Sequence, residues 1–486
     1  MSPIVKTTLR SLCVLFAVLP FHTALADTTV SGTITDNVTW TPAEGPYVVS
    51  YVSIPSDASL TILPGTVVKV YDGGNAFTVD GSLTVGANGA APVIITSLRD
   101  DSIGGDTNKD GAVTTPAAGD WRSIIVNQGA HATFTNTLIR YGGQTFPISG
   151  SSILFHIFKN NGGNLTLDHD TIAHSTNNAI YQTAGTTTLT NSAIDNATNG
   201  IYADGGAVEL SDNTFTHLSY YAVAITGAAQ LKNNAGNSGT GGIYLDTFTG
   251  ATTLPADTLP YLLGSPTLPS GAALTILPGA IVKFLNDSGL TVEGTLTVGA
   301  NGRAPVIITS YRDDTVLGDT NGDGTSTTAH PGDWRSITVH TGGEASFTNT
   351  LIRYGGGYVS CFCGGVTGLP LIQNKGGTLT LDHATLALSG NDALVQTAGA
   401  ATVLSSTIDN ADYGLRISGG SLAIGDDTFT HLAYDAVTVT GTTGFVNYGN
   451  NHGEGGISVS AIAAGDRKST RLNSSHIQKS RMPSSA

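Results

Sequence analysis

The feature of this sequence that most constrains its fold is a repeat of 21 to 22 residues. Large apolar residues recur at this spacing in two stretches, at Ile172, Ile194 and Phe215 and again at Leu386, Ile408 and Phe429. Each repeat holds short segments of alternating apolar and polar residues separated by Gly, Asn and Asp, a pattern typical of strands and turns. A β-sandwich has frequent turns but no apolar column that stays in step through many repeats. The period therefore predicts an all-β solenoid of stacked coils.

A longer duplication overlies the short repeat. The segment FTNTLIRYGG occupies residues 134–143 and returns unchanged at 347–356, 213 residues later. The duplication predicts two tandem modules, residues 27–240 and 241–454, with 455–465 as the start of a third.

The two ends of the chain differ from this repeated body. Residues 1–26 combine basic Lys6 and Arg10, a short apolar run and an Ala-Leu-Ala site before Asp27. This arrangement predicts a Sec signal peptide, because the apolar run is too short to span a membrane. Residues 466–486 are basic and unpatterned, and they resemble the in-frame translation of a sequencing-library adapter. We expect this tail to be an assembly artefact; the alternative is a genuine basic tail.

The charge balance and the cysteines limit the partners of the chain. The formal net charge is −15, and the basic residues of the two ends leave the repeated body more acidic still. This excess argues against nucleic acid or an anionic membrane as a partner. Beyond residue 26 the cysteines are Cys361 and Cys363, whose spacing is poor for a mutual disulfide. We interpret them as incidental loop cysteines; the alternative is a metal-binding pair.

Both modules resemble the right-handed parallel β-helix, pectate-lyase-like proteins of bacterial exteriors. The resemblance rests on LTILPGTVVKV, on the GDTN-x-DG loop followed by GDW, and on FTNTLIRYGG, and it covers nearly all of residues 28–465. It implies a right-handed parallel β-helix. It does not imply one activity, because this scaffold carries lyases, hydrolases, adhesins and structural proteins.

Each module has one loop with the pattern of a cation site. Asp, Asn and Asp at alternate positions can direct several hard oxygens at one ion, and the Gly that follows permits a sharp turn. The predicted ligands are Asp106, Asn108 and Asp110 in the first loop and Asp319, Asn321 and Asp323 in the second. We predict structural calcium; the alternative is a loop whose Asx turns bind only its own backbone.

The calcium loops are not EF-hands. Ala117 and His330 stand where the bidentate Glu of an EF-hand would be. Further acidic residues are therefore needed to complete each shell. The candidates are Asp100, Asp101 and Asp120 in the first module and Asp313, Asp314 and Asp333 in the second.

Several other repeated residues are predicted to be structural. A polar column three residues before the apolar column should turn the corner of each coil; its members are Asn136, His169, Asn191 and Asp212. Lys69 and Lys283 are predicted to be solvated strand residues. Trp121 and Trp334, in the GDW motif, should close each loop onto the solenoid.

Catalysis is the alternative interpretation of the same loops. The enzymes that the chain resembles use carboxylates with calcium, plus an Arg or Lys that removes a proton. The alternative catalytic set is Arg99, Asp100 and Asp101, with Arg312, Asp313 and Asp314. Arg140 and Arg353 more simply form an Arg–Asp pair or stack on Tyr. The Gly-His-Gly triplet of the hydrolases is missing from the sequence, and the histidines on coil turns have no evident base partner: His169, His217, His383 and His431.

The sequence favours an extracellular or cell-surface binding and spacer protein over an enzyme. Its expected partner is a polysaccharide or another cell surface. The loops 144–160 and 357–373 differ between the modules and are candidate binding loops; the aromatics that could stack on sugars are Phe146, Phe155, Phe158, Tyr358 and Phe362. The alternative is a glycoside hydrolase or a calcium-dependent polysaccharide lyase. A third hypothesis is an autotransporter-like passenger.

Overall fold

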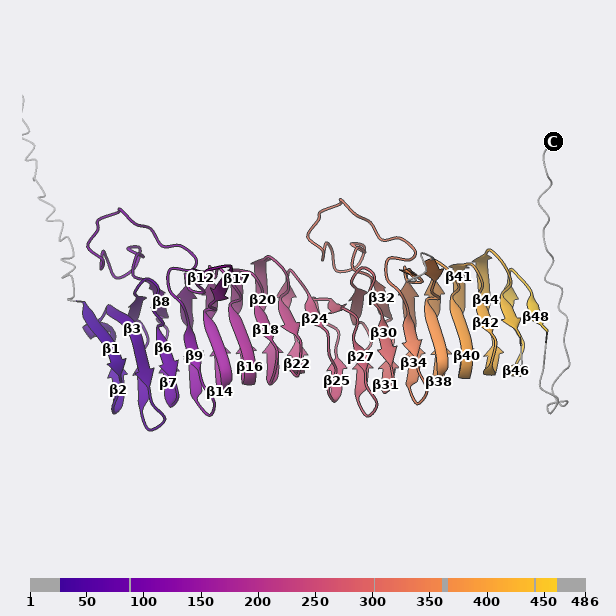
Figure 1. Cartoon of the computed structure of the whole chain (residues 1–486), viewed down its shortest axis with the longest axis horizontal. Coiled ribbons are helices and arrows are strands. Elements are labelled where there is room, and N and C mark those ends of the chain that lie inside the picture. The colour runs from indigo at the N-terminus through magenta and orange to yellow at the C-terminus, as the bar shows by residue number, and fades with distance from the viewer. Residues whose placement is uncertain (1–26, 87–88, 301, 361–365, 441–442, 461–486) are drawn as a thin grey trace, which may run out of the picture.

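The computed structural model describes residues 27–86, 89–300, 302–360, 366–440 and 443–460. Over these residues the chain is a parallel β-solenoid of about 19 turns, with 51% of residues in strands and 1% in helix (Figure 1). The predicted all-β solenoid is confirmed. Within the described part, no helix is long and apolar enough to cross a membrane. The predicted signal peptide and the predicted adapter-derived tail lie outside the described residues.

Successive coils stack strand on strand in parallel register. In the first module β15 (Thr171–Ala173) pairs with β17 (Ala193–Ala197), which pairs with β20 (Thr214–Leu218). These pairs align Ile172 with Ile194 and Ile194 with Phe215, and all three side chains are fully buried. The apolar column predicted from the period is therefore the interior of the solenoid.

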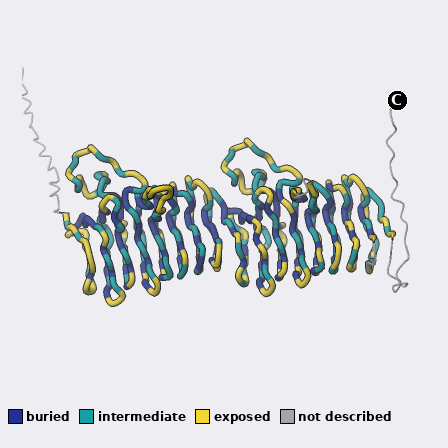
Figure 2. The backbone as a smooth tube through the Cα atoms, viewed as in Figure 1, coloured by how far each residue is buried: buried dark blue, intermediate teal, exposed yellow. Residues whose placement is uncertain are grey.

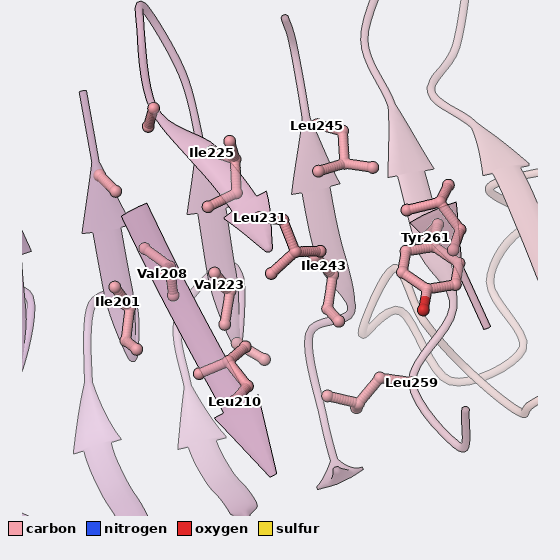
Figure 3. Close-up of a cluster of buried hydrophobic side chains, with 14 of the residues drawn as sticks. Ile201, Val208, Leu210, Val223, Ile225, Leu231, Ile243, Leu245, Leu259 and Tyr261 are labelled. Atoms are coloured by element: carbon pink, nitrogen blue, oxygen red, sulfur yellow. The ribbon is translucent and has the colours of Figure 1, made fainter. Parts of the chain in front are cut away.

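A second strand column shows how burial and backbone pairing increase together. Strands β18 (Ile201–Ala203), β21 (Val223–Ile225) and β24 (Ile243–Leu245) pair in parallel. The side chains of Ile201, Val223 and Ile243 lie one above another inside the coil (Figure 3). Outward positions alternate with them, so buried and more exposed residues alternate along the tube (Figure 2). Each added coil satisfies backbone groups and buries apolar surface at once.

The predicted polar corner column is confirmed. Asn136, His169, Asn191 and Asp212 all have left-handed backbone angles, with φ between 49° and 58°. Asn and Asp tolerate this conformation better than most residues. The Asn191 side chain also donates a hydrogen bond to Asp168 in the coil before it, at 3.0 Å. These residues turn the chain and connect neighbouring coils.

A buried amide ladder inside the coils was not predicted. The Asn160 carbonyl oxygen accepts hydrogen bonds from the backbone N–H groups of Gly162 and Gly163. Its amide nitrogen donates to the Gln182 side chain at 3.2 Å. Both side chains are fully buried, and Asn374 and Gln396 repeat the arrangement in the second module. The amides satisfy backbone groups where the chain bends between two strands.

One strand column crosses the boundary between the two sequence copies. Strand β24 pairs with β26 (Tyr261–Leu263), which pairs with β29 (Ile281–Phe284). By contrast, β22 (Gln230–Ala235) and β25 (Ala251–Leu254) belong to different sheets. The Tyr261 side chain fills this junction, and its hydroxyl accepts a hydrogen bond from Asn234 at 2.8 Å and donates one to the Pro255 carbonyl at 2.9 Å (Figure 3).

A buried carboxyl group in the second module predicts a specific pH dependence. Asp427 is fully buried and accepts hydrogen bonds from the backbone N–H groups of Ser406 and Gly425. Burial raises its pKa to about 6, although these hydrogen bonds lower it. Because the folded state penalises the ionised form, this contribution to stability is present at low pH and is lost as the pH rises through about 6. Asp427 should therefore make the second module about 1 kcal/mol more stable at pH 5 than at pH 8.

The matching position of the first module supplies the test. Asn213 stands there, accepts a hydrogen bond from the Ser192 N–H and donates one to the Leu189 carbonyl. Asp427→Asn should remove the pH-dependent difference, and Asn213→Asp should add a similar one to the first module. Denaturant unfolding of the three proteins at pH 5 and pH 8 measures both effects. Equal pH slopes in all three would contradict the assignment.

Candidate metal centre

One long loop leaves each module on the same side of the solenoid (Figure 1). The first loop follows β8 (Val93–Ser97) and precedes β9 (Ile124–Val126). The second follows β32 (Val306–Ser310) and precedes β33 (Ile337–Val339). Both loops begin with Arg-Asp-Asp and end with Gly-Asp-Trp, so they have matching roots.

An Arg–Asp pair fixes the start of each loop. The Arg353 guanidinium donates to the Asp313 carboxylate at 2.6 Å, and Arg140 pairs with Asp100 at the same distance. Asp313 is 1% exposed. Burial alone would raise the pKa of Asp313, but hydrogen bonds from the Thr309 and Thr315 hydroxyls and the charge of Arg353 outweigh it and lower the pKa. The predicted Arg–Asp pair is confirmed.

The same arginines also pack on tyrosine rings. The guanidinium carbon of Arg353 lies 5.2 Å from the centre of the Tyr354 ring, and Arg140 lies equally far from Tyr141. The arginine of LIRYGG therefore does both things that were expected as alternatives: it pairs with an Asp and stacks on a Tyr.

The arginine of Arg-Asp-Asp ties the start of the loop to its end. Arg99 donates to Asp72 at 2.8 Å and to Asp120 at 3.2 Å. In the second module Arg312 donates to Asp333 at 3.0 Å. Asp120 and Asp333 thus hold the loop root and lie outside the three-carboxylate clusters described below. The six residues of the alternative catalytic set are divided between these ion pairs and the acidic clusters described below.

The tryptophans lie beneath the loops as predicted. Trp121 and Trp334 are fully buried, and the Trp334 indole N–H donates to the Arg353 carbonyl at 2.9 Å. The Trp334 ring stacks on Phe284, with 4.4 Å between ring centres. A Cβ atom on Gly355 would lie 2.6 Å from the Trp334 ring, which explains the first Gly of the repeated LIRYGG.

The prediction that Lys69 and Lys283 are solvated was wrong. Both side chains are fully buried, because each loop folds back over the outer face of its strand. The Lys283 ammonium donates to the Gly318 carbonyl at 3.2 Å and to the Thr320 hydroxyl at 2.6 Å. Desolvation lowers its pKa to about 8, although Asp313 and other nearby carboxylates raise it. Each lysine acts as an internal cation that holds the back of the loop.

Three carboxylates converge in each loop, one from the loop root and two from the Asp/Asn turn. One oxygen each from Asp314, Asp319 and Asp323 lies within 4.8 Å of the others, and Asp101, Asp106 and Asp110 form the equivalent group. Two of the three predicted Asp/Asn ligands of each loop are therefore brought together, joined by one candidate from the loop root. Asp100 and Asp313, the other root candidates, are held in the ion pairs above.

The predicted asparagines support the turn. Asn321 donates from its amide to Asp323 at 2.9 Å and to the Thr327 hydroxyl, and Asn108 makes the same two contacts in the first loop. Asp319 accepts hydrogen bonds from the backbone N–H groups of Gly322 and Gly324. Gly324 has a φ of 72°, the left-handed conformation that the sharp turn requires.

Each acidic cluster holds several carboxylate charges close together. One carboxylate oxygen of each of Asp101, Asp110 and Asp314 is buried and has no hydrogen-bond partner among the described residues. Burial raises the pKa of Asp314, and the charges of Asp319 and Asp323 raise it further, against the opposing effect of Lys283. Carboxylates held this closely repel one another unless a proton or a cation lies between them. The geometry is thus able to hold a hard divalent ion.

The two candidate binding loops form projecting hairpins. In the first module β12 (Thr145–Ile148) pairs with β13 (Ser151–Leu154), and in the second β36 (Tyr358–Ser360) pairs with β37 (Val366–Gly368). Phe146 and Tyr358 are exposed on them. Phe155 is half-buried against the guanidinium of Arg122.

The prediction that Phe158 could stack on sugars was wrong. Phe158 is fully buried and packs edge-on against Phe134, with 5.0 Å between ring centres. It belongs to β14 (Phe158–Asp168), whose alternation turns this residue inward. Phe362, with Cys361 and Cys363, lies outside the described residues.

The turn histidines do have carboxylate partners, contrary to the sequence interpretation. His217 lies 2.6 Å from Asp195, and His431 lies 2.7 Å from Asp409. These partners are 22 residues earlier, one coil away, so no local motif reveals them. His169 and His383 each contact the Asp directly before them. The hydrogen bond that the His431 ring donates to Asp409 raises the pKa of His431.

The loops, their roots and the hairpins make up the distinctive surface of each module. A scan against protein-family models found no match, and no curated protein matched the sequence.

Proposed function

We propose that this protein is an exported, extracellular or cell-surface β-solenoid that acts as a calcium-stabilised binding and spacer protein. Its proposed partner is a polysaccharide or another cell surface. The observation that carries the proposal is the pair of matching acidic clusters, with two buried carboxylate oxygens in the first and one in the second that lack a hydrogen-bond partner among the described residues.

Calcium suits the donor set of these clusters. It accepts six to eight oxygen ligands in flexible geometry, so three carboxylates with carbonyls and water can complete its shell. The buried lysine behind each loop binds loop carbonyls and, within the described part of the chain, forms no ion pair with the three carboxylates of the cluster. A bound ion would pin the tip of a loop whose two ends are already tied together by Arg99 or Arg312.

The proposed spacer role follows from the architecture. Each coil contacts its neighbours through parallel strands, so length is added without a change of interior. The loops and hairpins project from one side of this body (Figure 1). A rigid rod with projections on one side can hold binding surfaces away from the point where the protein is attached.

Removal of calcium tests directly whether a bound ion stabilises the protein. Adding a chelator should lower the melting temperature. An ion that binds only the folded state, at a free concentration of about a hundred times its Kd, stabilises that state by about 2.7 kcal/mol. Asp106→Asn combined with Asp319→Asn should abolish the response to the chelator. Asp412→Asn, an exposed Asp outside both clusters, serves as the control and should respond like the wild type. A melting temperature that the chelator does not change would overturn the calcium assignment.

The alternative function is a polysaccharide lyase or glycoside hydrolase that acts on an acidic polysaccharide. An open cavity of about 270 Å³ lies beside the first loop root and is lined in part by Arg99, Asp101 and Tyr141, which favours this alternative. The ion pairs of Arg99 with Asp72 and Asp120 oppose it, because a general base must be free to accept a proton.

An ultraviolet assay for unsaturated uronate products on pectate and alginate separates the two functions. The binding proposal expects no turnover. Turnover that disappears in Arg312→Ala or Asp314→Ala would establish the lyase instead.

A further inference from the structure

A row of tyrosines runs along the outside of the first module toward the second. Tyr181 and Tyr202 are outward residues of neighbouring strands in direct register, with 6.0 Å between ring centres. Two coils further on, the Tyr244 ring stacks on Tyr221 at 4.7 Å and 10°. Tyr220 lies beside Tyr221 and is 64% exposed. We call these five residues the tyrosine stripe.

The second module shows that the fold does not require this stripe. At the positions of Tyr181, Tyr202 and Tyr244 it has Val395, Arg416 and Ser458. The same strands pair there in the same order, through β40 (Leu394–Leu404), β42 (Leu415–Ile417), β45 (Val437–Val439) and β48 (Ile457–Val459). The inward residues of these strands keep their apolar character where they differ, as in the replacement of Ile201 by Leu415. Asp435 replaces Tyr221, whereas Tyr434 keeps the position of Tyr220 and stacks on Tyr413 at 4.7 Å. The row formed by Tyr181, Tyr202, Tyr221 and Tyr244 therefore belongs to the surface of the first module and not to the scaffold.

The polar groups of the stripe are acceptors of hydrogen bonds from hydroxyl groups. Asp204 accepts a hydrogen bond from the Tyr181 hydroxyl at 2.9 Å, and burial together with Asp204 raises the pKa of Tyr181 to about 12. Asp246 lies close enough to Tyr244 to raise the pKa of that tyrosine as well, in addition to burial. The hydroxyls thus stay protonated, and the carboxylates keep free lone pairs.

These groups select a class of ligand. Tyrosine offers an apolar ring and a polar hydroxyl together, which matches a sugar with apolar C–H faces and equatorial hydroxyls. The carboxylates repel a polyuronate but accept hydrogen bonds from a neutral glycan. Adjacent coils are about 4.8 Å apart, so the stripe presents repeated contacts along a line. An extended polymer lying parallel to the solenoid axis can use several of them at once.

We propose that the tyrosine stripe binds a neutral polysaccharide laid along the first module. This inference deepens the binding role proposed above and rests on it. It places the binding surface on the outer face of the coils and specifies a polysaccharide without charged groups.

Affinity electrophoresis tests the inference with named probes. The full chain is run through gels that contain hydroxyethylcellulose, soluble starch, galactomannan or polygalacturonate, each with calcium and with a chelator. At least one neutral polymer should retard the wild type. Tyr181→Val combined with Tyr244→Ser places second-module residues in the first module, so the coils should remain folded, as circular dichroism will check. This variant should bind at least about tenfold more weakly.

The matched control is Tyr434→Ser, which removes an exposed tyrosine from the second module and should bind neutral polymer like the wild type. Retardation by a neutral polymer that the stripe variant retains would overturn the inference. Retardation by polygalacturonate alone, equal in wild type and variant, would overturn the inference while supporting the general binding role. Retardation by none of the four polymers would overturn both.

Discussion

Arg353→Met is expected to destabilise the second module by about 3–5 kcal/mol, because it leaves a buried carboxylate without its counter-charge. Asp313 is 1% exposed, and its ion pair with Arg353 joins the loop root to strand β35 (Thr350–Arg353). The Thr309 and Thr315 hydroxyls would still donate to Asp313, but they carry no charge. Denaturant unfolding followed by circular dichroism measures the loss.

Two variants separate this cause from a general loss of arginine. Arg335→Met removes an exposed arginine of the same module and should change stability by less than about 0.5 kcal/mol. Asp313→Leu added to Arg353→Met removes the stranded charge and should recover part of the lost stability. A loss below about 1 kcal/mol in Arg353→Met, or no recovery in the double variant, would show that the pair does not anchor the loop.

Trp334→Ala is expected to cost about 3–5 kcal/mol, the range for truncating a fully buried Trp. The indole packs on Phe284 and its N–H bonds the Arg353 carbonyl, so its removal also opens a cavity beneath the loop. The loop should then become susceptible to proteolysis near its Gly-rich tip, before the coils unfold. Denaturant unfolding and limited proteolysis measure the two effects.

Leu317→Ala is the control for the Trp334 prediction. Leu317 is 42% exposed on the same loop, so its truncation should have little effect on stability. Equal sensitivity to proteolysis in both variants would mean that the Trp does not close the loop onto the solenoid.

The coil interior could be predicted because it is periodic. Ile172, Ile194 and Phe215 recur in step, and any one-residue slip would turn the whole column outward. The corner residues were predictable for the same reason, since Asn191 and its counterparts occupy the left-handed turn of each coil. In a solenoid the same structural position recurs in every coil, so its residue preference appears several times in the sequence.

What could not be predicted depends on contacts between distant segments. Lys283 looks like an ordinary outward strand residue, and only the return of the loop over it, about 35 residues later, buries it. Asp195 partners His217 across one coil, which local sequence around either residue does not reveal.

The different roles of the two Asp residues in Arg-Asp-Asp could not be predicted from the sequence either. The sequence offers Asp313 and Asp314 as equal candidates for the cation shell. The structure turns Asp313 inward to Arg353 and leaves Asp314 beside Asp319 and Asp323. Both residues lie in the turn that follows β32, where no strand alternation shows which of the two side chains faces the solenoid.

Isothermal titration of the metal-free protein with calcium measures directly whether each acidic cluster binds an ion. We expect two ions per chain, one for each acidic cluster, and one ion per chain after Asp319→Asn combined with Asp323→Asn. Asp313→Asn should lower the stability of the second module and leave two ions bound per chain. Titration heats no larger than those of dilution, or a stoichiometry that the double variant leaves unchanged, would contradict the calcium-stabilised function.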